Sequence, residues 1–166
     1  MSTLYDRNIA LLKSSGVAYR EVEHEAVLSY EMAASVHQRF GLTGVESKSL
    51  LLRLKDGRYC MFVSVEGKRA NIKKIKDLVR SKPSLCADEE LVEQTGCVPK
   101  CACPFGHEER IILIIDSAIF NYAKFLYSPG MPERTVEIAT ADLEKIIAGL
   151  PNPVVRYTLN ESDIPA

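Results

Sequence analysis

Two apolar segments joined by a tight turn constrain the fold of this chain more than any other feature of its sequence. Residues 50–54 read LLLRL, and residues 59–65 read YCMFVSV, which is rich in aromatic and β-branched residues. Between them lies the segment KDGR, and an Asp-Gly pair between two apolar runs is a strong hairpin signal. Strands that are apolar along most of their length are covered on both faces. The sequence therefore predicts a buried β-hairpin.

Helices and further strands are expected on both sides of this hairpin along the chain. Helical spacing of apolar residues predicts helices that begin at the caps Thr3, Ser29, Asn71, Asp88 and Thr140. In the helix after Asn71, residues 72, 75, 78 and 79 should face inward. Strands are predicted at residues 17–23, 111–115, 124–127, 134–139 and 154–157, and a loop at residues 97–107. Because helices and strands do not repeat strictly as βαβ units, the fold class is mixed α/β, a mixed sheet or small barrel flanked by helices.

Length and composition favour one globular domain over residues 1–166, in which residues 160–166 form a polar tail. The longest apolar run, residues 111–115, is far shorter than the roughly 20 residues of a membrane-spanning helix. Asp6 and Arg7 stand where a secretory signal needs an apolar stretch. We therefore expect a cytoplasmic protein without a membrane partner, whose five cysteines are reduced.

Basic residues are concentrated in one segment of a chain whose formal net charge is −1. Between Lys48 and Lys82 there are eleven basic and three acidic residues, so this segment carries +8. The outward positions of its helix are basic; they are Lys73, Lys74, Lys76 and Arg80. A basic face on an acidic body suits a polyphosphate, although lysines on an amphipathic helix are also typical of an ordinary solvated face.

Common catalytic and metal-binding motifs are missing from the sequence. Cys97, Cys101, Cys103 and His107 offer zinc-type ligands, but the spacing C-x3-C-x-C-x3-H is unusual for zinc. A structural metal, a reactive thiol and small buried thiols are therefore all open interpretations, and buried thiols are favoured. His37 is expected to be an exposed surface residue at the polar edge of its helix.

Lys48 opens the hairpin between two serines, where neighbouring positions should be apolar. A lysine at the edge of a core needs a partner, which would be a structural carboxylate or an oxygen of a ligand. The turn at Pro104, Phe105 and Gly106 leads into the strand at residues 111–115, and a glycine there would let backbone N–H groups approach a substrate. A lysine together with backbone donors would stabilise an oxyanion without a metal.

Several segments in order give the chain a resemblance to a known family. They are HEAVLSYEMAA at residues 24–34, SKSLLL at 47–52, PFGH at 104–107 before the strand at 111–115, and TADL at 140–143. In this series the chain resembles the YbaK/ProX family of aminoacyl-tRNA deacylases, which includes the insertion editing domain of bacterial prolyl-tRNA synthetases. The resemblance implies a YbaK-like mixed β-barrel or sheet that hydrolyses the ester of a mischarged tRNA.

The resemblance also implies roles for individual residues. Lys48 would engage the substrate carbonyl or the terminal adenosine phosphate, and Gly106 would offer backbone contacts. His24 and Ser29 would form the rim of the pocket, and Pro104, Phe105 and His107 would belong to the substrate-binding turn. The helix carrying Lys73, Lys74, Lys76 and Arg80 would contact the phosphates of the acceptor stem.

No metal or cofactor is implied, because the attack would rely on the substrate through the ribose 2′-hydroxyl or a cysteine thiol. A freestanding trans-editing enzyme is expected, which acts on a small amino acid such as Cys, Ala or Ser on tRNA-Pro or a similar tRNA. A synthetase or elongation factor is a possible further partner, and DNA is not. The alternative is a non-catalytic module of the same fold that binds a tRNA end or a nucleotide.

Two segments depart from the family pattern. Residues 98–103 carry a lysine and two thiols where relatives often have small residues, which would alter the size of the pocket or let a thiol interfere. Residues 128–131 lack the histidine of the alanine-specific branch, so the sequence does not support alanine specificity. The identity of the amino acid stays open.

Overall fold

Helices and strands alternate irregularly along residues 2–163, which are the residues that the computed structural model describes. The α-helices are α1 (Leu4–Ser15), α2 (Tyr30–Phe40), α3 (Ile72–Val79), α4 (Asp88–Thr95) and α5 (Leu143–Ala148). The strands are β1 (Tyr19–Glu23), β2 (Val45–Leu54), β3 (Tyr59–Val65), β4 (Pro83–Leu85), β5 (Ile112–Asp116), β6 (Lys124–Tyr127), β7 (Arg134–Ala139) and β8 (Val154–Tyr157). Short 3₁₀ helices are η1 (Ser117–Asn121), η2 (Thr140–Asp142) and η3 (Glu161–Asp163).

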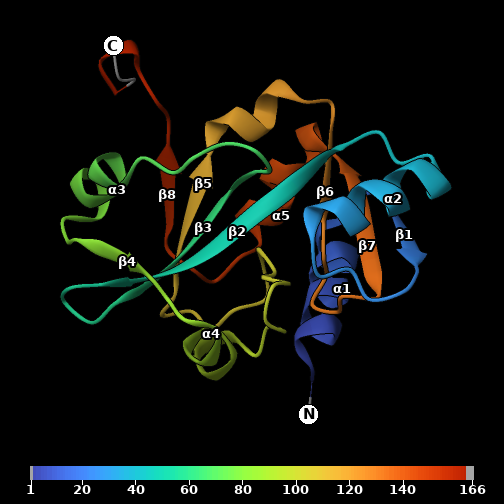
Figure 1. The fold of residues 1–166 in the computed structure, drawn as a ribbon, viewed down its shortest axis with the longest axis horizontal. Helices are drawn as coiled ribbons and strands as arrows, with labels where there is room; N and C mark the ends of the chain where they lie inside the picture. Colours follow the sequence, from blue (N-terminus) through green and yellow to red (C-terminus); the bar gives the residue numbers. More distant parts are fainter. Residues whose placement is uncertain (1, 164–166) are drawn as a thin grey trace.

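The strands form one mixed sheet in the order β1-β7-β6-β2-β3-β5-β8, and β4 pairs with β2 off this path (Figure 1). The predicted hairpin is confirmed as the antiparallel pair of β2 and β3, while β6 joins β2 and β5 joins β3 in parallel. In Figure 1 the long strand β2 runs through the middle of the molecule, between α3 at one end and α2 at the other. Strand β2 therefore pairs directly with three strands, β3, β4 and β6.

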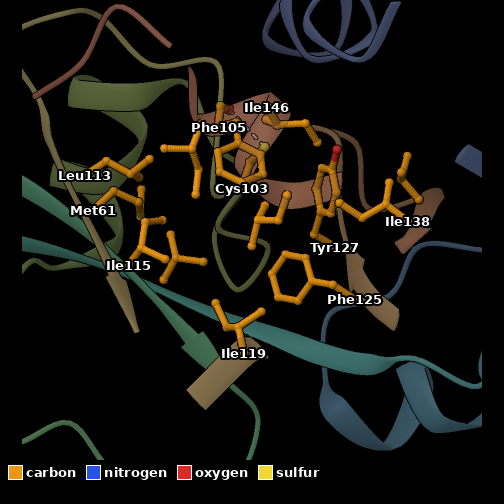
Figure 2. Packing of buried hydrophobic residues seen from close by; sticks show 14 of the residues in the cluster. Met61, Cys103, Phe105, Leu113, Ile115, Ile119, Phe125, Tyr127, Ile138 and Ile146 are labelled. Carbon is orange, nitrogen blue, oxygen red and sulfur yellow. Dashed lines mark hydrogen bonds between the residues drawn. The ribbon is translucent and has the colours of Figure 1, made fainter. Parts of the chain in front are cut away.

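Helices cover both faces of the sheet, as the mixed α/β prediction requires. One face packs against α1, α4, α5 and the loop at residues 97–107, and its core includes Phe105, Tyr127 and Ile146. Figure 2 shows Cys103 and Phe105 pointing into this cluster, between Met61 and Leu113 on one side and Tyr127 and Ile138 on the other. The opposite face packs against α3 through Ile75 and Val79, and against α2 through Val36.

Most helix ends follow the predicted caps. In α1, Thr3 and Asp6 form a reciprocal capping box, and Ser29 and Asn71 accept backbone hydrogen bonds at the starts of α2 and α3. The caps predicted at Asp88 and Thr140 are wrong, because the N-cap of α4 is Ala87 and Thr140 opens a 3₁₀ turn with its hydroxyl buried.

Three further expectations change with the tertiary structure. Strand β4 was not predicted, since three residues carry too little periodicity to identify a strand. Ile72, expected to face inward, is the first residue of α3 and is 45% exposed. The predicted tail at 160–166 is ordered at η3, where the Asp163 carbonyl accepts a hydrogen bond from Asn71 Nδ2 at 2.9 Å. Residues 164–166 lie outside the described residues.

None of the helices in the described part of the chain is both long enough and apolar enough to cross a bilayer.

Candidate active site

An opening along one edge of β2 creates a cavity. At the start of β2, Val45 and Glu46 pair with β6, and at its end residues 52–54 pair with β4. Residues 47–51 lie between these two pairings. A cavity of about 480 Å³ occupies this opening and is bounded by α2, β2, the end of β4, the start of α4, the loop at residues 100–102 and the β6–β7 segment. Its size is within the range of small-molecule sites.

The walls of this cavity carry many small polar groups. Hydroxyls come from four segments of the fold; they are those of Ser29, Tyr30, Ser47, Ser49, Ser128 and Thr135. Apolar walls are formed by residues such as Ala33, Leu51 and Leu91. The cavity therefore suits a ligand that is small and hydrogen-bonds through several atoms.

Ser49 presents both its side chain and its backbone to the opening. Its Oγ is buried and has no hydrogen-bond partner among the described residues. Hydrogen bonds from Glu66 N to Glu46 O (2.9 Å) and from Cys86 N to Leu51 O (3.0 Å) show that even positions of β2 bond toward β3 and odd ones away from it. Because this direction alternates along a strand, the N–H and C=O of Ser49 point away from β3, into the opening.

His24 and Thr135 form a pair at another wall. The Nδ1 of His24 lies 2.7 Å from the Glu25 carbonyl, and Nε2 lies 2.8 Å from Thr135 Oγ1. A carbonyl oxygen only accepts, so Nδ1 carries the proton, and in the neutral ring Nε2 accepts from the Thr135 hydroxyl. His24 therefore acts on the cavity by orienting Thr135, and it is Thr135 that lines the wall. Ser29, the other predicted rim residue, lines the cavity directly.

The loop at residues 97–107 reaches the cavity through residues 100–102, which the sequence did not predict to bind substrate. Cys101 N donates to Val98 O at 2.9 Å, and this closes a turn with Lys100 at φ +68°. Proline at the second position and a positive φ at the third define a type II turn, where glycine is usual. This turn places the exposed Lys100 and the half-buried Cys101 at the cavity.

A carboxylate also reaches the cavity, on β2. Glu46 lines the wall and its Oε2 lies 2.7 Å from His37 Nε2. The prediction of an exposed surface histidine at residue 37 is wrong. Only 20% of the His37 side chain is exposed, because the side chain of Glu46 on β2 packs against it. No signal within α2 alone could have identified this pair, since the partner lies on a different element.

The structure does not bring Lys48 and Gly106 together. Lys48 lies opposite Ser64 in β3, on the face away from Ser47 and Ser49, and its Nζ donates to the Lys68 carbonyl at 2.9 Å. The Gly106 carbonyl accepts a hydrogen bond from Arg7 Nε at 2.8 Å. The sheet therefore separates the Lys48 ammonium from the turn that holds Gly106.

The other residues of that turn are packed inside the protein. Pro104, Phe105 and His107 are buried, and Phe105 packs edge-on against Tyr127 with ring centroids 5.4 Å apart (Figure 2). His107 Nε2 lies 2.6 Å from the Cys103 carbonyl. None of these three residues lines the cavity in the described part of the chain. The turn at residues 104–107 therefore packs in the core and anchors the loop, whereas residues 100–102 face the cavity.

Comparison with known proteins identifies the family to which this geometry belongs. A profile described as "Aminoacyl-tRNA editing domain" matches residues 24–146. The chain belongs to the aminoacyl-tRNA editing family. This confirms the resemblance to YbaK-like deacylases and, at the level of the family, the prediction of an aminoacyl-tRNA hydrolase.

Individual relatives of this editing domain agree with that assignment. The chain is 27% identical over 150 residues to the "Multifunctional Ser/Thr-tRNA deacylase ProXp-y" of Escherichia coli strain K12, across 87% of this chain and 89% of the relative. Solved structures share its fold. The hypothetical protein APE2540 has a TM-score of 0.77 at 20% identity, over 91% of this chain and 98% of that one. A candidate trans-editing enzyme for prolyl tRNA synthetase has a TM-score of 0.73 at 21% identity, over 96% and 99%.

The thiols of this editing domain are poor nucleophiles. Burial raises the pKa of the Cys101 thiol above its ordinary value, and the pKa of Cys86 rises to about 12, chiefly through burial. Both thiols therefore stay protonated near neutral pH. Cys97, Cys103 and His107 make hydrogen bonds to their own loop, and no three of the described His, Cys, Asp or Glu residues are grouped as metal ligands. These contacts fit the interpretation as buried thiols.

The basic helix of the editing domain lies on the other face of the sheet from the loop at residues 97–107. On α3, Lys73, Lys76 and Arg80 are exposed, while Lys74 pairs with Asp163 at 3.3 Å. Three of the four predicted tRNA-binding side chains therefore reach solvent on one helix, without a carboxylate partner among residues 2–163.

Proposed function

We propose that this chain is a freestanding trans-editing deacylase that hydrolyses the ester between a small hydroxylated amino acid, serine or threonine, and a tRNA. The observation that carries the proposal is the cavity at the β2 opening, whose walls supply six hydroxyls and whose size suits a small aminoacyl group with its ribose. The Ser/Thr activity stated in the name of the E. coli relative supports the same substrate class.

Ester hydrolysis needs donors at the oxygen that gains negative charge. We assign this role to Ser49, because its backbone N–H points into the opening and its Oγ is buried without a partner. Water adds to the ester carbonyl, the carbonyl oxygen becomes an oxyanion held by Ser49, and the ester bond to the ribose breaks. The proton of the water passes through the ribose 2′-hydroxyl to the leaving 3′-oxygen, so the reaction needs no histidine in the cavity.

Lys48 is proposed to bind a phosphate of the acceptor end rather than the ester carbonyl. Its ammonium donates to a neutral carbonyl, that of Lys68, and no carboxylate of the described residues lies within ion-pair distance. Its charge therefore stays available for an anion. From Lys68 the chain continues through the exposed Arg69 to Lys73 on α3. We propose that the acceptor stem runs from the cavity across Lys48 to α3.

The deacylation assay tests this proposal with tRNAs that carry serine, threonine, alanine or cysteine. We expect release of serine and threonine, and Ser49→Ala should lower kcat by about 10²-fold, the magnitude of losing one oxyanion donor. Since Ser49 Oγ has no partner to lose, the free energy of unfolding should change by less than about 0.5 kcal/mol. Ser14→Ala, on the exposed side of α1, is the matched control and should keep full activity.

Absence of release from all four tRNAs would contradict the proposal, and tRNA binding without release would favour the non-catalytic module. The proposed contacts between α3 and the phosphates of the acceptor stem are tested separately, by measuring tRNA affinity as a function of salt concentration. Lys73→Ala and Lys76→Ala should each reduce the slope of log affinity against log salt by about one. A slope unchanged in both variants would show that α3 does not contact the phosphates of the tRNA. A synthetase or elongation factor as partner, and a cytoplasmic location, stay predictions.

A further inference from the structure

One carboxylate of the cavity is held in a fixed position by a residue from another element. Glu46 lies on β2, and its Oε2 is 2.7 Å from Nε2 of His37 on α2. Only 21% of the Glu46 side chain is exposed. Its second oxygen, Oε1, has no hydrogen-bond partner among residues 2–163. The pair therefore presents one oriented and partly desolvated acceptor at the cavity wall.

The charge of Glu46 acts on the interior of the cavity. It contributes to raising the pKa of the Tyr30 hydroxyl, after burial, and it also raises the pKa of the Cys101 thiol. Both residues line the cavity, on α2 and on the loop at residues 100–102. The negative field of Glu46 therefore extends across the space between these walls.

Other charged groups at the cavity do not compensate this field. Arg134 is already paired with Glu21 and Glu23, at 3.2 Å each. Asp88 and Lys100 also line the cavity, but both are exposed to solvent, where their opposite charges are screened. The carboxylate of Glu46 is the least exposed charged group among the residues that line the cavity, so the cavity favours a ligand that carries a positive charge close to its polar atoms.

We propose that Glu46 binds the α-ammonium group of the aminoacyl substrate and that His37 is its positioning residue. This inference rests on the proposed function, because the ammonium group is the cation that an aminoacyl ester carries next to its reacting carbonyl. It implies a substrate filter. A tRNA whose amino acid is blocked at nitrogen, such as a peptidyl-tRNA, lacks the ammonium group and is rejected, so the enzyme acts on free aminoacyl-tRNA alone.

The test compares seryl-tRNA with the same tRNA after nitrous acid deamination, which replaces the amino group by a hydroxyl of similar size. Wild-type protein should prefer seryl-tRNA in kcat/KM by about 10-fold to 100-fold, as expected for a hydrogen bond between charged groups. Glu46→Gln should reduce this preference to about twofold or less. Glu93→Gln, the matched control at an exposed carboxylate of α4 that does not line the cavity, should keep the wild-type preference.

His37 is tested by the same ratio, which a purely structural role would not move. His37→Ala should lower the preference, and His37→Gln, which keeps an N–H donor, should restore most of it. Equal rates on both tRNAs in the wild type would overturn the inference, as would a Glu46→Gln variant that loses rate on both and keeps the ratio.

Binding of a non-hydrolysable analogue separates this inference from the proposed function. Adenosine with a 3′-serylamide and its α-hydroxy counterpart are titrated against wild type and Glu46→Gln. If no tRNA is hydrolysed, the proposed function fails, yet a wild-type preference for the amino analogue that Glu46→Gln abolishes still supports the ammonium site. Equal affinities for the two analogues in the wild type would overturn it.

Discussion

Replacement of Gly106 by alanine distinguishes a structural role of this glycine from the substrate contact that the sequence predicted. Gly106 has φ +92°, and a Cβ there would lie 2.7 Å from Asn8 Nδ2 and 3.0 Å from Leu4 Cδ1. Asn8 is buried on α1, and its Nδ2 donates to the carbonyls of Leu4 (3.0 Å) and Phe105 (2.9 Å). The methyl group would therefore displace an amide that ties α1 to the loop.

Two contributions set the size of the effect. A side chain at this positive φ costs about 1–2 kcal/mol. Displacing the Asn8 amide leaves buried carbonyls without a donor, which costs about 1–3 kcal/mol. We therefore expect Gly106→Ala to lower the free energy of unfolding by about 2–5 kcal/mol, a large share of the 5–15 kcal/mol typical of a domain.

Urea unfolding followed by circular dichroism measures this difference. Gly67→Ala is the matched control, since Gly67 has φ +85° but a Cβ there would meet nothing within 4 Å. The Gly67→Ala variant should lose only the free energy of unfolding that a side chain at a positive φ costs, about 1–2 kcal/mol. Equal destabilisation of the two variants would refute the steric argument. A Gly106→Ala protein as stable as Gly67→Ala but without deacylase activity would instead indicate that Gly106 contacts the substrate.

Three further results are expected. Asp116 is fully buried and accepts hydrogen bonds from Lys68 (2.8 Å) and from a serine of β3, so Asp116→Asn should cost about 2–4 kcal/mol in urea unfolding; a loss below about 0.5 kcal/mol would contradict this. Burial lowers the pKa of His107 below its ordinary 6.5, so the unfolded chain binds this proton more readily. The contribution of His107 to stability is therefore present above pH 6.5 and is lost as the pH falls through the folded pKa. In urea unfolding measured at several pH values, His107→Gln should reduce the change in the free energy of unfolding over this pH range. Because burial raises the pKa of Cys86 to about 12 and that of Cys101 above its ordinary value, mass spectrometry should find both thiols alkylated much more slowly by iodoacetamide than a free cysteine, and fast alkylation of Cys101 would be evidence against a protonated thiol.

Much of the fold follows from local patterns. The hairpin of β2 and β3 rests on two apolar runs around an Asp-Gly turn, and the starts of α1, α2 and α3 rest on side chains within three residues of the backbone groups they cap. Such signals act between neighbours in the chain, so a single sequence contains them. The caps at Asp88 and Thr140 show the limit, because a suitable residue type does not ensure the cap geometry.

The site depends on pairings between distant segments. Lys48 and residues 97–107 stand out in the sequence, yet Lys48 does not line the cavity and bonds the Lys68 carbonyl, while its neighbour Ser49 lines the cavity. In the loop, the turn at Lys100 faces the cavity while Gly106 packs against Asn8.

By itself, then, the sequence determined most of the helices and strands, the mixed α/β class and the family, because periodicity, caps and ordered motifs are properties of the linear chain. The tertiary structure alone decided that β6 and β4 leave an opening beside residues 47–51, and that His37 meets Glu46 from another element. The physical reason is that strand pairing and packing fix which face of each strand meets which neighbour, and these contacts join residues that are far apart in the chain.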